Sequence, residues 1–231
     1  MGAVGKLIAL LVVEFAVLMA VLAALLFGTA GTTDWPSGWA YLGLFLVVGG
    51  AVSLWLAAVD PALLAERLKP PVQRGQGTWD RLFLLAVMVV YIAWHVLMAL
   101  DARRFGWSHV PLAVQALGGA LITASYAGIA WVYRANSFAA PVIRVQRERR
   151  QTVIDTGPYA YVRHPMYAFA APMFVGIPLM LGSWWGLLAV PAIYAGVGWR
   201  AMREERLLRA ELEGYEGYAR RVRWRLAPGV W

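Results

Sequence analysis

The chain has 231 residues, of which 61% are hydrophobic and only 15% charged, and its mean hydropathy is +0.59. Soluble domains carry about a quarter charged residues, so this composition excludes a soluble globular protein and indicates a membrane protein. The absence of cysteine excludes disulfides, thiolate metal sites and a cysteine nucleophile. The three histidines are far apart and lack ligand spacing, so no metal site is predicted.

Apolar stretches of spanning length predict an all-α, polytopic membrane protein with about five to six transmembrane helices. The last two form a C-terminal hairpin, because a stretch without any charged side chain, 168–199, is long enough to enter a bilayer and return. The predicted helices cover 5–29, 38–58, 82–100 and 110–133, followed by the hairpin arms 166–183 and 184–200.

The net charge of +8 is distributed asymmetrically along the chain. Arg103 and Arg104 are the only basic residues in a loop assigned to the outer side, and all other Lys and Arg residues lie on the opposite side. By the positive-inside rule, both termini and the polar C-terminal region are expected in the cytoplasm. The basic excess is then explained by topology and by anionic headgroups, so nucleic acid is not an expected partner.

Four features of the N-terminal half, 1–133, are consistent with a helical scaffold. The loop from Pro61 to Arg81 contains Lys69-Pro70-Pro71 and Arg74-Gly75-Gln76-Gly77, which cannot continue a helix. At its end, the run Trp79-Asp80-Arg81 is typical of an interfacial anchor. Glu14 and His95 lie within predicted spans, where a buried position facing the bundle interior or a cavity is expected because an ionisable group is costly in hydrocarbon. Small residues such as Gly118-Gly119-Ala120 predict close helix contact.

The segment from 134 to 165 is polar and basic, and it connects the scaffold to the hairpin. Val153 to Pro158 predicts a short extended piece followed by a turn, because proline disfavours a helical conformation in the preceding Gly157. After the hairpin, 201–220 is predicted to be one charged helix lying against the membrane surface. The Arg-rich tail 220–225 is predicted to bind headgroups.

Polar clusters stand at both ends of the hairpin, so the hairpin predicts that they meet at one membrane surface. The first contains Arg163-His164-Pro165, with the proline at the first turn of a helix, and the second contains Arg200 with Glu204-Glu205. Arg200 and Glu204 are four residues apart and share a helical face. Two interpretations are open: they form an ordinary helical ion pair, or the carboxylate binds a ligand ammonium or ribose while the guanidinium holds a carboxylate in bidentate fashion.

The C-terminal motifs resemble those of a known family. The motifs are, in chain order, G-P-Y-x-x-x-R-H-P-x-Y, an apolar hairpin, R-x-x-x-E-E-x-x-L, Y-x-x-Y and R-V-x-W-R-L-x-P-G-V-W. They are similar to those of the isoprenylcysteine carboxyl methyltransferases and the related phospholipid methyltransferases. The resemblance covers about 136–231. It implies a membrane-embedded enzyme that uses S-adenosylmethionine at the cytoplasmic face and releases S-adenosylhomocysteine, with 134–231 as the catalytic region.

The same resemblance implies roles for particular residues. Arg200, His164 and Glu204 are the expected catalytic residues, and Arg200 is expected to face a lipophilic or prenylated methyl acceptor. Gln151 stands where enzymes of the isoprenylcysteine group commonly carry histidine, so the resemblance does not identify the acceptor. The expected cofactor contacts are Gln151, Thr152, Val153, Ile154, Tyr159, His164, Pro165, Met166, Tyr167 and Glu204.

Several functions remain compatible with the sequence. A carboxylate acceptor is ionised at neutral pH and needs no general base, whereas an amine or hydroxyl acceptor needs one, for which His164 is the nearest candidate. A phospholipid N-methyltransferase is therefore one alternative. An NADPH-dependent membrane reductase of the sterol-reductase kind and a non-enzymatic lipid-binding anchor are the others.

Overall fold

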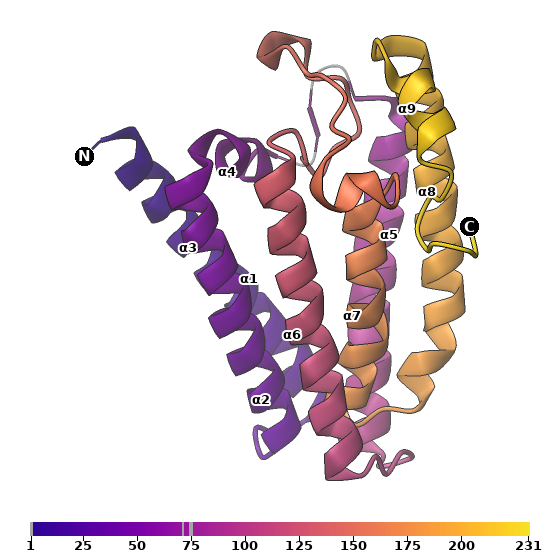
Figure 1. Ribbon diagram of the computed structural model, residues 1–231. Coiled ribbons are helices and arrows are strands. Elements are labelled where there is room, and N and C mark those ends of the chain that lie inside the picture. The colour runs from indigo at the N-terminus through magenta and orange to yellow at the C-terminus, as the bar shows by residue number, and fades with distance from the viewer. Residues whose placement is uncertain (1, 71, 74–75) are drawn as a thin grey trace.

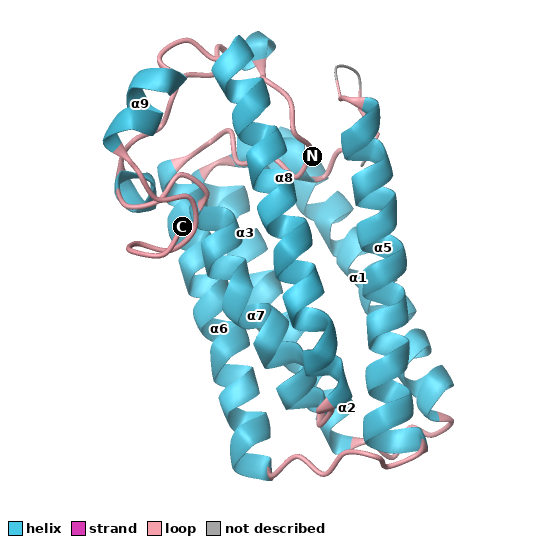
Figure 2. Cartoon of the chain, turned by 90° about the vertical axis from the view of Figure 1, so that its right-hand side faces the viewer, coloured by secondary structure: helices cyan, strands magenta, loops and turns pink. Residues whose placement is uncertain are grey.

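A computed structural model of the chain describes residues 2–70, 72–73 and 76–231. Within these residues all regular structure is helical, which confirms the predicted fold class (Figures 1 and 2). The helices are α1 (Ala3–Ala30), α2 (Pro36–Leu44), α3 (Gly50–Val59), α4 (Pro61–Arg67), α5 (Thr78–Ala99), α6 (Leu112–Ala135), α7 (Pro165–Leu181), α8 (Val190–Glu211) and α9 (Tyr215–Arg221). Short 3-10 turns cover Arg147–Arg149, Gly157–Ala160 and Trp185–Ala189.

Four helical stretches are long and apolar enough to span a membrane, and they coincide with the four predicted before the hairpin. A π-helical turn at Phe45–Gly49 joins α2 and α3 into one span, and another at Leu100–Arg104 extends α5. Only 22% of the most apolar window of each span is buried, so most of this surface faces outward, as expected of lipid-exposed helices. The spans are Val4–Ala30, Pro36–Val59, Thr78–Arg104 and Leu112–Ala135.

The hairpin is present, but its second arm differs from the prediction. α7 forms the first arm, and α8 begins at Val190 and passes residue 200 without a break as far as Glu211. The predicted separate helix over 201–220 is therefore wrong. No glycine or proline lies between Arg200 and Gly214, so the helix continues until Leu212 adopts an extended conformation, with φ −107° and ψ 109°. Gly214, at a φ of +82°, then lets α9 turn back. The upper half of α8 consequently places Arg200 and Glu204 on one rigid element.

The loop before α5 also contains more helix than predicted. Asp60 caps α4 by accepting a hydrogen bond from the Leu63 N–H at 2.9 Å, and the helix ends at Arg67, ahead of Pro70. α5 then begins at Thr78, four residues earlier than expected. The parts of the loop prediction that concern Pro71, Arg74 and Gly75 lie outside the described residues.

Close contact between α6 and α7 fixes the position of the hairpin. A Cβ atom on Gly118 would lie 2.5 Å from the backbone N of Met180, and one on Gly176 would lie 2.6 Å from the carbonyl O of Gly118. The two backbones therefore touch, as the small residues predicted. Because α7 is held against α6, the residues at its N-terminus have a fixed place at the upper end of the bundle in Figure 1.

The two ionisable residues within predicted spans behave differently. His95 is fully buried and hydrogen-bonded to the Tyr41 hydroxyl at 3.1 Å and to the Tyr91 carbonyl at 2.9 Å, as expected of a packed interior residue. Glu14 is exposed on the outer face of α1, so its predicted interior position is wrong. α1 contacts the rest of the bundle along one side only, and Glu14 lies on the other side.

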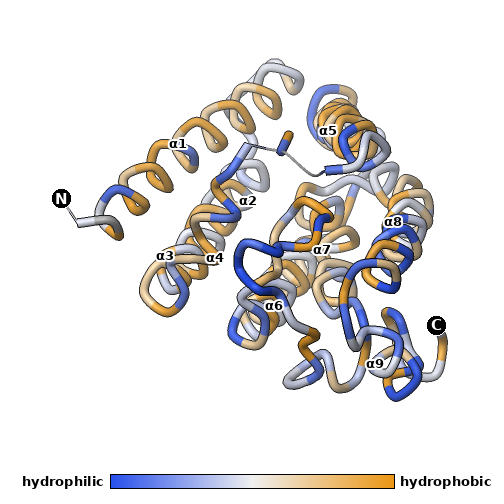
Figure 3. The backbone as a smooth tube through the Cα atoms, turned by 90° about the horizontal axis from the view of Figure 1, so that it is seen from above, coloured by the Kyte–Doolittle hydropathy of each residue, from blue (hydrophilic) through white to orange (hydrophobic). Residues whose placement is uncertain are grey.

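Hydrophilic segments gather at the upper end of the bundle. Figure 3, viewed from above, shows them on the connector between α6 and α7, on the upper part of α8 and on α9, whereas α1 and α5 are largely hydrophobic. The polar connector therefore covers the end of the bundle at which α7 begins.

Candidate functional site

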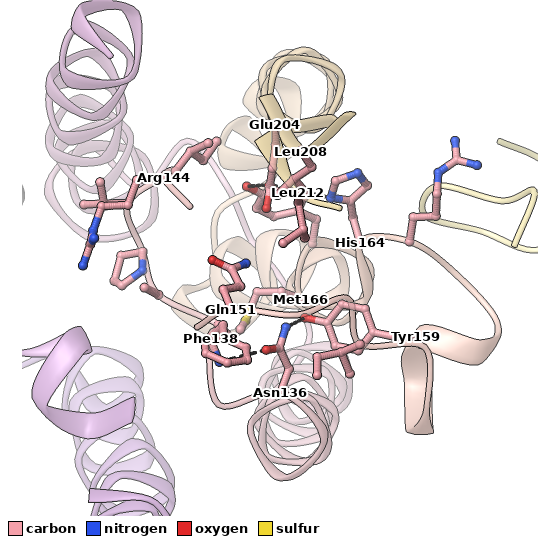
Figure 4. Close-up of a pocket in the computed structure, with 18 of the residues that line it drawn as sticks. Asn136, Phe138, Arg144, Gln151, Tyr159, His164, Met166, Glu204, Leu208 and Leu212 are labelled. Carbon is pink, nitrogen blue, oxygen red and sulfur yellow. Dashed lines mark hydrogen bonds and ion pairs between the residues drawn. The ribbon is translucent and has the colours of Figure 1, made fainter. Parts of the chain in front are cut away.

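A cavity of about 350 Å³ lies under the connector, between α4, α5, α6, α7, α8 and α9 (Figure 4). This volume is at the lower end of the range for small-molecule pockets. Pro165 is the only predicted site residue that does not line it; it is buried at the first position of α7 instead. The predicted residues in the wall are Gln151, Thr152, Val153, Ile154, Tyr159, His164, Met166, Tyr167, Arg200 and Glu204.

One side of the cavity is formed by the connector segment 151–154, which has no regular secondary structure. The Gln151 side chain accepts a hydrogen bond from the Gln146 backbone N–H at 2.8 Å, which fixes the start of this segment. The Tyr159 hydroxyl accepts a hydrogen bond from Asn136 Nδ2 at 2.7 Å, so the turn after the segment is tied to the end of α6. Among the described residues, the peptide groups of Thr152 to Ile154 make no backbone hydrogen bonds, which leaves them free for a ligand.

Glu204 supplies the only carboxylate among the described residues that line the cavity. Its Oε2 accepts a hydrogen bond from the Tyr167 hydroxyl at 2.9 Å and lies 3.6 Å from His164 Nδ1. The side chain of Glu204 remains 27% exposed, in contrast to that of His164 at 4%. Burial alone would raise the pKa of Glu204, but hydrogen bonding and charge from His164 outweigh it and lower the pKa, so the carboxylate stays ionised.

His164 is held between two carboxylates. Its Nε2 lies 3.2 Å from Glu205 Oε1, and its ring stacks on Tyr167 at 5.7 Å between centroids. Burial would lower the pKa of His164, but its hydrogen bonds with Glu204 and Glu205 outweigh this and raise the pKa. The protonated form is therefore more favoured than in a free imidazole, and a ring with a carboxylate next to each nitrogen is poorly placed to take a proton from an acceptor.

Glu205 is a central residue of the site, and although it belongs to the second polar cluster, the sequence did not predict a role for it. Only 3% exposed, it accepts a hydrogen bond from Arg163 Nε at 2.7 Å, and its Oε1 also lies 3.2 Å from Arg225 Nε. Arg163 Nη1 in turn donates to the carbonyls of Val222 and Arg223 at 2.8 and 3.0 Å. Glu205 thus joins α8, the entrance to α7 and the C-terminal tail.

The C-terminal tail is docked by backbone hydrogen bonds as well. The N–H groups of Arg163 and His164 donate to the carbonyls of Trp224 and Arg225, each at 2.9 Å. The tail prediction is therefore wrong for Arg225, which turns inward to Glu205. The contacts fix the residues immediately before α7 and so hold His164 in place.

Arg200 is paired with Asp80, not with Glu204. Its Nε and Nη2 donate to Asp80 Oδ1 at 3.3 and 3.0 Å, and Nη2 also donates to the Pro141 carbonyl at 2.6 Å. A guanidinium offers a carboxylate two bidentate edges, one formed by Nε and Nη2 and the other by the two Nη atoms. Asp80 occupies the first edge, and the Pro141 carbonyl takes the Nη2 hydrogen of the second. Neither edge is therefore open to a substrate carboxylate in this arrangement. The alternative Arg200–Glu204 ion pair is wrong, whereas the bidentate grip on a substrate carboxylate stays a prediction that requires Arg200 to release one of these partners. Asp80 is fully buried, so it is not the interfacial anchor expected.

We expect the docking of the tail to fail in acid. Burial alone would raise the pKa of Glu205, but the His164 and Arg163 contacts lower it from 4.5 to about 2. A depressed carboxyl pKa contributes stability that is complete above the unfolded value and is lost as the pH falls through the folded value. The measurement is the rate at which an acid-stable protease cleaves the tail, taken at decreasing pH from 5 downward. This rate should rise as the pH approaches about 2. In Glu205→Gln this acid dependence should be flattened, and an unchanged profile would contradict the assignment.

With this geometry in place, the chain can be compared with known families. Residues 113–213 match the family model of phospholipid methyltransferases. This is a family of integral-membrane methyltransferases, so the match confirms the resemblance inferred from the C-terminal motifs. No curated protein matches the chain.

The matched region runs from the start of α6 to just past the end of α8. It contains every residue predicted for the site from Gln151 to Glu204, together with Glu205. It leaves out Asp80 on α5 and the tail with Arg225, which contact the site from outside the matched residues.

Proposed function

We propose that the protein is an integral-membrane methyltransferase that uses S-adenosylmethionine to methylate a lipophilic acceptor, an isoprenylcysteine-type carboxylate or a similar amphiphile. The observation that carries the proposal is Glu204, a lone ionised carboxylate in the wall of a cavity built largely from the region that matches the phospholipid methyltransferase family. The cavity and the C-terminal region are assigned to the cytoplasmic side by the positive-inside distribution of charge.

The residues of the cavity fit the cofactor. A carboxylate that is ionised and partly exposed suits either the two ribose hydroxyls or the ammonium group of S-adenosylmethionine. The free peptide groups of Thr152 to Ile154 suit the polar edge of an adenine, and Leu208 and Leu212 provide an apolar wall for its ring. S-adenosylmethionine would supply an electrophilic methyl group on a sulfonium.

In this proposal the protein contributes positioning and charge control. Tyr167 and His164 hold Glu204, while Glu205 and the docked tail hold His164. The rings of Tyr159 and Tyr167 line the cavity, where aromatic faces stabilise a cation. The acceptor would enter from the bilayer past Leu84 of α5 and Ala170 of α7, which line the cavity from membrane helices.

The state of His164 bears on the choice of acceptor. Because each of its ring nitrogens faces a carboxylate of the protein, a carboxylate acceptor, which needs no base, is the better fit to these residues. The family match instead favours a second candidate, a phospholipid N-methyltransferase acting on an amine headgroup.

A transfer assay tests the proposal and separates the two candidates. Purified protein in bilayer nanodiscs is incubated with methyl-labelled S-adenosylmethionine and a total membrane lipid extract, and the labelled lipid is then treated with base. We expect labelled lipid whose label is released by base, because methyl esters hydrolyse. Label that survives base would indicate an N-methylated product, and absence of any label in lipid would contradict the proposed activity.

A further inference from the structure

We propose that Asp80 is a positioning residue that keeps Arg200 away from Glu204, so that Glu204 stays free to bind the cofactor. The inference rests on the proposed function and extends it to α5, outside the region that matches the family. It gives a role in the cofactor side of the site to a residue that does not itself line the cavity.

Asp80 is held by two contacts besides the one with Arg200. Its Oδ2 accepts hydrogen bonds from Gln76 Nε2 at 2.9 Å and from the Ile143 backbone N–H at 3.2 Å, which attach the carboxylate to the preceding loop and to the connector. Its Oδ1 is then left for Arg200. The carboxylate is 0% exposed, so water does not compete for these contacts.

Arg200 is restrained on several sides as a result. Besides Asp80 and the Pro141 carbonyl, its guanidinium lies 5.5 Å from the ring centroid of Phe83 and 6.0 Å from that of Tyr167. Only 11% of its side chain is exposed. A buried guanidinium needs a carboxylate partner, and removal of that partner leaves a costly unpaired charge.

Glu204 is the partner that Arg200 would otherwise take. It lies one turn farther along α8, at the spacing that lets two side chains meet, and it is the lone carboxylate among the described residues of the cavity wall. No ion pair within 4.0 Å joins the two among the described residues, because Arg200 is turned to Asp80. An Arg200–Glu204 pair would neutralise the group on which cofactor binding depends.

The affinity for S-adenosylhomocysteine, measured by calorimetry on the full chain in nanodiscs, tests this role. We expect Asp80→Ala to weaken binding about tenfold, the effect of engaging one charged hydrogen-bonding group elsewhere. The isosteric Asp80→Asn should weaken it less. Arg200→Met added to Asp80→Ala should restore the affinity to within about twofold of the wild type, since the competing cation is gone. Asp34→Ala, which removes an exposed partner of Arg103 at the opposite end, serves as the matched control.

Recovery in the double variant is necessary for the proposal, but a purely structural role for Asp80 would also allow it, because the double variant removes the unpaired buried charge. The coupling between Arg200 and Glu204 in thermal unfolding is therefore the decisive result. Equal affinity of Asp80→Ala and the wild type, or a double variant without recovery, would overturn the proposal. A second experiment without any cofactor tests the role of Asp80 independently of the proposed function. Thermal unfolding should show coupling between Arg200→Met and Glu204→Gln only in the Asp80→Ala background. A wild type that binds no S-adenosylhomocysteine would refute the proposed function, and this coupling, present or absent, would still decide whether Asp80 directs Arg200.

Discussion

Replacing Glu204 by alanine is expected to reduce the affinity for S-adenosylmethionine by about 100-fold, the effect of removing a charged hydrogen-bond acceptor from a binding site. No other acidic side chain among the described residues lines the cavity, so nothing compensates for the loss. The loss of the Tyr167 hydrogen bond and the His164 contact adds to it. Equilibrium binding of the labelled cofactor to purified protein measures the change.

Glu213 offers a matched control on the same segment of chain. It is exposed just past the end of α8, and Glu213→Ala removes the same atoms without touching the cavity. We expect it to bind the cofactor as the wild type does. If both variants bind with equal affinity, Glu204 is not the cofactor carboxylate.

Replacing Glu205 by alanine is expected to destabilise the upper end of the molecule by about 3 to 5 kcal/mol, the usual cost of breaking a buried ion pair from one side. The change leaves the guanidinium of Arg163 buried without its carboxylate, since only 5% of that side chain is exposed. It also removes the partner of Arg225 and one partner of His164. The tail should therefore detach and the midpoint of thermal unfolding should fall.

Thermal unfolding and limited proteolysis measure this effect together. Glu216→Ala is the control, because Glu216 also contacts arginines but its side chain is 50% exposed, where an ion pair contributes little. Cleavage within 222–231 should become faster in Glu205→Ala and remain unchanged in Glu216→Ala. Equal stability of the two variants would show that Glu205 does not hold the tail.

The membrane architecture could be predicted from the sequence because it depends on local properties. Apolar length alone located the four long spans and the first arm of the hairpin. The end of α8 was misplaced because charge began at Arg200, whereas the backbone leaves the helical conformation only at Leu212. A helix ends where its backbone geometry fails, and the change from apolar to charged residues does not require an end.

The candidate site could be predicted in part for the same reason. Residues close to the hairpin ends come together through the hairpin itself, so the group from Gln151 to Glu204 was found. The Asp80–Arg200 pair joins residues 120 positions apart, and no local pattern connects them. Glu204 and Glu205 are adjacent in sequence, but they project about 100° apart around a helix. Only the packing of the tail shows that Glu204 lines the cavity and Glu205 is buried.

Glu14 shows the limit of a rule based on energy alone. Its cost in hydrocarbon predicted an interior position, yet α1 presents it outward. The rule describes a preference that the rest of the bundle can override, because the side of α1 that packs is determined by its larger apolar contacts, such as Leu22 and Leu26.

The central claim is that the cavity beneath the connector binds S-adenosylmethionine. Its most direct test is calorimetric titration of the purified full chain in nanodiscs with S-adenosylhomocysteine and, separately, with NADPH. The proposal predicts saturable binding of S-adenosylhomocysteine at one site per chain, lost in Glu204→Ala, and no binding of NADPH. Binding of NADPH in its place would identify a membrane reductase, and binding of neither would favour a lipid-binding anchor; either result would contradict the claim.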